Sequence, residues 1–167
     1  MPDLSQLLRD PQVEALLRVL LAGLLAALIG LEREMEGKAA GLRTYMLVGM
    51  GAAAFTVIGT LLYGAGDPAS RVGQGIVTGV GFLGAGVILQ MHRRVIGLTT
   101  AAGIWASAAV GMSIGGGLYV VGIGAAVAIF VVLQATGVER RLRSAAGPKP
   151  SEDVKPSEDA SEADLDD

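Results

Sequence analysis

Residues 98–134 read LTTAAGIWASAAVGMSIGGGLYVVGIGAAVAIFVVLQ, a run of 37 residues without a charged side chain. As one helix it would be about 55 Å long at roughly 1.5 Å per residue, too long for one crossing of about 30 Å of hydrocarbon. Gly115, Gly116 and Gly117 lie at its middle, and glycine readily adopts the positive φ angles of a tight turn. The run therefore predicts a hairpin of two membrane-crossing helices.

Three further apolar stretches precede this hairpin, and each is 19 or 20 residues long, the length that a bilayer crossing needs. Of all residues 51% are hydrophobic, and no acidic residue occurs between Asp67 and Glu139. A soluble domain needs a charged surface and would not leave so long a segment without an acid. The expected fold class is therefore all-α, a polytopic membrane protein with a bundle of five transmembrane helices at residues 13–31, 44–63, 72–91, 98–114 and 118–134.

Two helix beginnings are also visible, because Asp10-Pro11 and Asp67-Pro68 each place an N-capping carboxylate before a proline at the first helical position. Lysine and arginine favour the cytoplasmic side, and five crossings place eight of them on one side and two on the other. This predicts an N-terminus outside and a C-terminus in the cytoplasm. The expected domains are a short extracytoplasmic N-terminus at 1–12, a transmembrane domain at 13–143 and a disordered acidic cytoplasmic tail at 144–167.

The glycines of the third stretch include Gly79-Val-Gly81-Phe-Leu-Gly84, which has the G-x-G-x-x-G spacing of a dinucleotide-binding turn. That turn needs a preceding strand and an acid about 20 residues later, and neither is present. We expect no nucleotide there and no nucleic acid elsewhere. Glycines without Cβ atoms let membrane helices approach closely, within the bundle or in a homodimer. The glycines assigned to helix packing are Gly75, Gly79, Gly81, Gly84 and Gly86.

Polar residues gather at the ends of the stretches on the side predicted to be cytoplasmic. Two interpretations remain open for them: ion pairs that fix the loop geometry, or a binding site for a cation, a lipid head group or a partner protein. The residues of this predicted polar cluster are Glu32, Arg33, Arg43, Thr44, Thr99 and Thr100.

A second polar group, Arg71, Gln74 and Thr78, begins the third stretch with spacings of three and four, which place it on one helix face. This face could line a polar path or hydrogen-bond to neighbouring helices. Near the other end of the first stretch, Arg18 is expected to extend its head group to the outer interface.

No enzyme is expected, because one histidine, no cysteine and no acid from residue 68 to 138 exclude the usual metal and triad arrangements. No cofactor is predicted other than a possible Mg²⁺ ion. A hydrated Mg²⁺ ion would want clustered carboxylates, and the metal site stays unknown at this point.

Four blocks resemble the MgtC/SapB family. They are Ala27-Leu-Ile-Gly-Leu-Glu-Arg33, Ala40-Gly-Leu-Arg-Thr44, Arg71 followed by the segment from Gln74 to Ile88, and the segment from Gly97 to Gly111. The resemblance implies a multi-pass protein of the bacterial inner membrane with five helices. Thr99 and Ala106 stand where virulence-type members often have Asn and Cys, which indicates the short SapB-like form without a C-terminal ACT-like domain.

The family is linked to growth at low Mg²⁺ and, in pathogens, to survival in phagocytes. The resemblance therefore implies a protein of magnesium and energy homeostasis that regulates a membrane partner such as the F-type ATP synthase. The alternative function is a Mg²⁺ transporter or channel. Binding of anionic lipid at the basic cytoplasmic loops is a third possibility.

Overall fold

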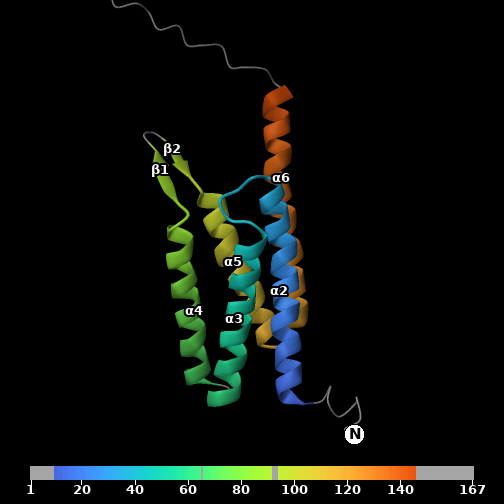
Figure 1. Ribbon diagram of the computed structural model, residues 1–167, viewed down its shortest axis with the longest axis vertical. Coiled ribbons are helices and arrows are strands. Elements are labelled where there is room, and N and C mark those ends of the chain that lie inside the picture. Colours follow the sequence, from blue (N-terminus) through green and yellow to red (C-terminus); the bar gives the residue numbers. More distant parts are fainter. Residues whose placement is uncertain (1–9, 65, 92–93, 146–167) are drawn as a thin grey trace, which may run out of the picture. The chain divides into compact units, whose positions relative to one another are not determined.

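The structure is a computed structural model that describes residues 10–64, 66–91 and 94–145. The chain divides into two units, residues 1–134 and 135–167, and the first unit contains the core and the polar contacts. The described part contains five helices, as predicted, and one short hairpin of two strands (Figure 1). In chain order the elements are α2 (Pro11–Met35), α3 (Leu42–Tyr63), α4 (Asp67–Ala85), β1 (Leu89–Met91), β2 (Arg94–Ile96), α5 (Leu98–Gly115) and α6 (Tyr119–Ala145).

The beginnings of α2 and α4 differ from each other, although both sequences read Asp-Pro. At α2 the prediction is confirmed, because the Asp10 carboxylate accepts a hydrogen bond from the N–H of Gln12 at 2.8 Å. At α4 the prediction is wrong, because the N-cap is Gly66 and Asp67 is already the first helical residue. Gly66 has a φ of 129°, which a residue with a side chain rarely adopts, so the chain turns at the glycine rather than at the acid.

The expected hairpin after α5 is confirmed. Helix α5 ends at Gly115, and Gly117 has a φ of 80° in the turn before α6. Helix α6, however, continues to Ala145, eleven residues beyond the predicted end at Gln134. The bilayer limits only the apolar part of a helix, and a charged continuation can stay helical in water. Residues 144 and 145, predicted to begin the disordered tail, are instead the end of α6. The rest of the predicted tail and the segment at residues 1–9 lie outside the described residues.

Helix α4 lies earlier in the chain than its predicted range of 72–91, because it begins at Asp67 and ends at Ala85 with Gly86 as the C-cap. Residues 89–91 instead form β1, which pairs antiparallel with β2 so that Leu89 faces Ile96. Glycines near residue 85 weaken the helix, and the β-branched residues around them favour extended backbone. Gly97 then has a φ of 94° as α5 begins. A Cβ atom there would overlap the carbonyl oxygen of Val87, which requires glycine at this position.

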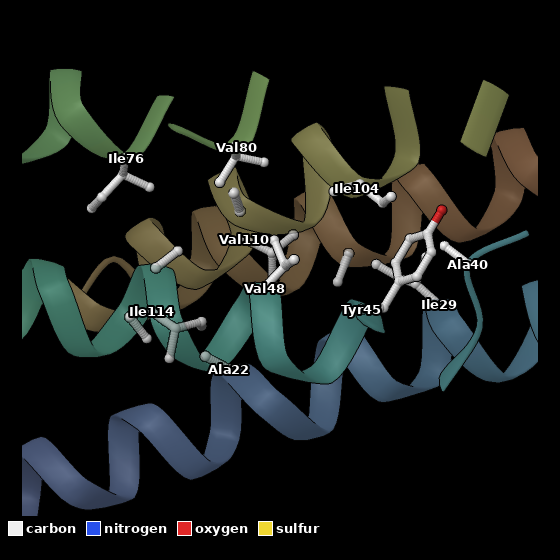
Figure 2. Close-up of a cluster of buried hydrophobic side chains, with 14 of the residues drawn as sticks. Ala22, Ile29, Ala40, Tyr45, Val48, Ile76, Val80, Ile104, Val110 and Ile114 are labelled. Atoms are coloured by element: carbon white, nitrogen blue, oxygen red, sulfur yellow. The ribbon is translucent and has the colours of Figure 1, made fainter. Parts of the chain in front are cut away.

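The core lies where α3 packs against α2 on one side and α5 on the other. Figure 2 shows its apolar side chains, which include Ile29, Val48 and Ile104. Small residues bring the backbones together at this interface. A Cβ atom on Gly49 would lie 2.6 Å from the Cβ of Ala26 on α2, and one on Gly111 of α5 would overlap the carbonyl oxygen of Gly49.

Much of the outer surface of this unit is apolar. Helix α2, for example, exposes a line of leucines from Leu16 to Leu31, whose side chains have exposed fractions between 46% and 60%. By length and composition, α2, α3 and α5 could each cross a membrane, and α6 has a shorter apolar part at Tyr119–Ala135. Helix α4 is not among the long apolar helices, since it carries the polar residues Arg71, Gln74 and Thr78.

Candidate functional site

The predicted polar cluster contains one buried charge, Arg33, whose side chain is 2% exposed. Its Nε and Nη2 atoms donate to the two carboxylate oxygens of Glu32, and Nη2 also donates to the carbonyl oxygen of Leu133 at 3.3 Å. A buried guanidinium is tolerated only when it is paired and hydrogen-bonded, and both conditions hold here. Arg33 therefore ties the last turns of α2 to α6.

A second buried contact joins α3 to α5. The Tyr45 side chain is fully buried, and its hydroxyl group donates to the carbonyl oxygen of Thr100 at 3.3 Å. Two glycines provide the space for this ring, because a Cβ on Gly30 would lie 2.8 Å from the Tyr45 Cβ and one on Gly103 would overlap the Tyr45 hydroxyl oxygen. The hydroxyl group is thus satisfied inside the protein.

The third contact caps α3. Its N-cap residue is Gly41, which has no side chain to accept a hydrogen bond. Instead the Glu34 Oε2 atom accepts one from the N–H of Leu42 at 2.8 Å. A carboxylate at a helix N-terminus satisfies a free N–H and interacts favourably with the helix dipole. Glu34 therefore connects the loop after α2 to the start of α3.

Not every residue of the predicted cluster takes part in these contacts. Glu32, Arg33 and Thr100 do, whereas Arg43 and Thr99 are exposed at the starts of α3 and α5. Thr44 is also exposed and lines an otherwise apolar cavity of about 400 Å³ with residues of α3, α4 and α5, among them Phe82. The predicted cluster thus divides into residues that make contacts between helices and residues that are exposed on the surface.

Two residues of these contacts, the exposed Glu34 and the buried Tyr45, are not among the residues of the predicted cluster. A signal existed for each. Gly41 gives the helix that follows no side-chain cap, so a nearby carboxylate was needed. A tyrosine hydroxyl group near the start of an apolar helix needs a partner as well.

The face formed by Arg71, Gln74 and Thr78 lies elsewhere, because α4 begins where α3 ends while the cluster lies where α3 begins. All three residues are exposed, and the Thr78 hydroxyl group donates to the carbonyl oxygen of Gln74 at 2.9 Å. The shared helix face agrees with the predicted spacing. No other helix of the described chain covers this face.

The glycines of α4 differ in their surroundings. A Cβ on Gly84 would lie 3.4 Å from the carbonyl oxygen of Ala101, so Gly84 packs against α5. A Cβ on Gly75, Gly79 or Gly81 would meet nothing within 4 Å, and one on Gly86 would meet only its own helix. Gly75 and Gly79 line an apolar groove of about 640 Å³ between α3 and α4. Packing by these glycines remains a prediction about contacts outside the described chain.

The guanidinium group of Arg18, near the start of α2, donates three hydrogen bonds within the chain. Its Nε donates to the Tyr119 hydroxyl oxygen at 3.0 Å, its Nη1 to the carbonyl oxygen of Gly115 at 3.3 Å, and its Nη2 to the Glu14 carboxylate. Acceptors from the turn between α5 and α6 lie within its reach, and its position at the outer interface stays a prediction. Two arginines thus hold α2 to the α5–α6 hairpin, one at each end of α2.

Carboxylates in these contacts have little capacity left for a cation. Glu32 binds Arg33, and Glu34 caps α3. Within the described ranges, no three residues among His, Cys, Asp and Glu come together as a metal site would require. A Mg²⁺ ion held by several carboxylates does not fit the arrangement of the polar cluster.

Long apolar helices with leucines on their outer surface define the class, a helical membrane protein. The family model of the MgtC family matches residues 19–142, and the chain belongs to this family. YhiD of Escherichia coli K12 is 45% identical over 130 residues, which cover 72% of this chain and 60% of YhiD.

Two further relatives support this assignment. SrpB of Synechococcus elongatus is 44% identical over 141 residues, which cover 77% of this chain and 76% of SrpB. MgtC of Brucella abortus is 52% identical over 97 residues, which cover 58% of this chain and 40% of MgtC. The chain therefore spans about 60% of the length of YhiD and less of MgtC. No solved structure matches the chain.

Proposed function

We propose that this protein regulates a membrane partner in magnesium and energy homeostasis, and that the F-type ATP synthase at low Mg²⁺ is such a partner. It acts in the bacterial inner membrane as a multi-pass protein of five crossing helices, with its N-terminus outside and its C-terminus in the cytoplasm. It acts by binding and not as an enzyme. Its relatives support the link to magnesium, since the name of YhiD assigns it provisionally to magnesium transport.

One observation carries the preference for regulation over transport: Arg33, which is buried, and Glu34, which is exposed, are both bonded within the chain. The Arg33 guanidinium donates hydrogen bonds to Glu32 and to the carbonyl oxygen of Leu133, and the Glu34 carboxylate accepts one at the start of α3. These groups hold helices together and leave no set of free ligands for an ion to pass. The polar groups that stay free lie on outer helix surfaces, where a protein partner can reach them.

The alternative function is a Mg²⁺ transporter or channel, with the ion as cargo. The face of Arg71, Gln74 and Thr78 favours it, because these residues are exposed and could contact a hydrated ion. Hydrated Mg²⁺ keeps several of its waters, so oxygen and amide groups can guide it without a cage of carboxylates.

Liposomes separate the two functions. The purified protein is reconstituted with an enclosed Mg²⁺-sensitive dye, and Mg²⁺ uptake is compared with that of empty liposomes. A regulator gives no uptake above the empty control while circular dichroism shows a folded protein. Uptake that disappears in Gln74→Ala would establish the transporter and overturn the proposed regulation.

Inverted membrane vesicles test regulation directly. ATP-driven proton pumping is measured in vesicles from cells with and without the protein, after growth at low Mg²⁺. The proposal expects slower pumping when the protein is present, at an equal amount of ATP synthase. Exposed positions of the cluster provide the variants, because Arg43→Ala and Thr99→Ala should relieve the inhibition without disturbing buried contacts. Equal pumping with and without the protein would contradict this partner.

A further inference from the structure

One face of α4 is exposed along the whole length of the helix. This helix packs against α3 and α5 through Ile76, Val80 and Gly84, which are all buried. The opposite face carries mainly polar or small residues, which are all exposed, and the exposed ring of Phe82 lies beside them. We call this face the α4 seam, and its residues are Asp67, Arg71, Gln74, Thr78, Gly81 and Ala85.

The spacing along the seam is four, three, four, three and four residues. This alternation keeps side chains on one stripe of a helix, and it is the spacing by which two helices pack side by side. Gly81 and Ala85 would allow close approach at one end of the stripe. The seam therefore has the geometry of a helix-packing surface, and no helix of the described chain packs on it.

Lipid is a poor neighbour for this face. The inference rests on the proposed topology, in which α4 crosses the membrane. Hydrocarbon offers no hydrogen bonds, so polar side chains within a bilayer face protein or water. Thr78 uses its hydroxyl group on the carbonyl oxygen of Gln74, but the Gln74 amide has no partner among the described residues. The seam therefore needs a polar partner.

The chemistry of the seam is self-complementary. Asp67 and Arg71 have opposite charges one helical turn apart, and no ion pair joins their side chains within the described chain. The Gln74 amide both donates and accepts hydrogen bonds, so it can pair with an identical amide. Placed in parallel about a twofold axis, two such seams put identical residues opposite each other, so the two amides meet and each acid lies within about one helical turn of the arginine of the other helix.

We propose that a second copy of this chain packs along the α4 seam, with the two α4 helices parallel in the membrane. The two helices approach most closely at Gly81. A second copy fits this face because its own α4 presents the same acid, arginine and amide at matching heights.

Cysteine cross-linking tests this contact, because the chain has no cysteine of its own. Thr78→Cys places a thiol on the seam. Val77→Cys is the matched control, since Val77 is 42% exposed but lies about 100° around the helix from Thr78. Mild oxidation of isolated membranes should give a disulfide-linked dimer at least about fivefold more abundant for Thr78→Cys than for Val77→Cys, because a disulfide requires Cβ atoms about 4 Å apart.

Several results would overturn the proposal. Equal cross-linking at Val77→Cys would show random collision. A seam cysteine that does not cross-link but reacts with a water-soluble maleimide would show a water-lined path. A seam cysteine that does neither would show lipid or another protein against this face. Labelling of Val77→Cys by the maleimide, near the middle of α4, would refute the membrane crossing itself, and the proposal with it.

Charge exchange gives a second measurement that does not depend on disulfide geometry. Two differently tagged copies are expressed together and purified through one tag. Asp67→Arg should reduce recovery of the second copy at least about tenfold, since it gathers like charges on the seam. Adding Arg71→Asp to the same chain should restore it, because the acid and the base have then only exchanged places. Failure of this restoration, with both variants folded by circular dichroism, would refute the pairing. Neither measurement involves Mg²⁺ or ATP, so its outcome is independent of the proposed regulation.

Discussion

Replacing Gly49 with alanine tests the packing of α2 against α3. Gly49 lies at the centre of this contact, and a Cβ atom added to it would lie 2.6 Å from the Cβ of Ala26 and 3.2 Å from the carbonyl oxygen of Ala22. Both neighbours belong to α2, and neither is the flexible end of a long side chain. The clash can be relieved only by moving one helix away from the other.

The size of the effect follows from these distances. Two carbon atoms pack best at about 3.5–4.0 Å, so the helices must separate locally by about 1 Å. Overpacking of this kind costs about 1–3 kcal/mol. Alanine also raises helix propensity by up to about 1 kcal/mol relative to glycine, which partly offsets the loss.

Gly51→Ala is the control that removes this offset. Gly51 is two residues further along α3, and a Cβ atom there meets nothing within 4 Å. The two substitutions have the same gain in helix propensity and differ in packing alone. We therefore expect Gly49→Ala to be less stable than Gly51→Ala by about 1–3 kcal/mol.

The assay is unfolding of the purified protein in mild detergent by increasing fractions of sodium dodecyl sulfate, followed by circular dichroism. Only the difference between the two variants is interpreted, so the uncertain reference state in detergent cancels. If the two free energies of unfolding agree within about 0.5 kcal/mol, the close approach of α2 and α3 at Gly49 is refuted.

Three more substitutions examine the polar contacts by the same unfolding assay. Glu34→Ala should lower the free energy of unfolding by about 1 kcal/mol, because it removes the cap of α3, whereas Glu36→Ala should have little effect. Arg33→Met should lower it by up to about 3 kcal/mol by leaving the Glu32 carboxylate unpaired, and adding Glu32→Gln should recover part of the loss. Tyr119→Phe should cost about 1 kcal/mol through the lost hydrogen bond to its arginine partner. An effect of Glu36→Ala as large as that of Glu34→Ala would contradict the cap, and a double variant no more stable than Arg33→Met would contradict the ion pair.

The number of helices could be predicted from the sequence because hydrocarbon imposes a length on apolar segments. The ends of α4 and α6 could not, for two different reasons. Hydropathy does not change between Ala85 and Met91, yet glycine and β-branched residues convert the end of this stretch from helix to a strand. At α6 the hydropathy changes near Gln134, but the helical backbone does not, because charged residues form helices equally well.

The polar cluster illustrates a different limit. A sequence shows that Glu32 and Arg33 are near the membrane surface, but neighbours along a helix normally point in different directions. Their pairing depends on the carbonyl oxygen of Leu133, a hundred residues later, which fixes the guanidinium in place. Every residue has a backbone carbonyl oxygen, so the sequence does not show which one will accept a given hydrogen bond. The same holds for the carbonyl oxygen of Thr100 as the partner of Tyr45.

The glycines show why a motif alone does not assign a role. Gly49 and Gly79 belong to similar small-residue patterns in apolar helices, but one has no room for a methyl group and the other has open space around it. The first therefore holds the chain's own fold together. The second, like the polar seam on the same helix, is left without a partner by the chain itself. Groups that a fold does not satisfy internally are the ones available for binding, so the search for a partner should begin at α4 rather than at the buried arginine.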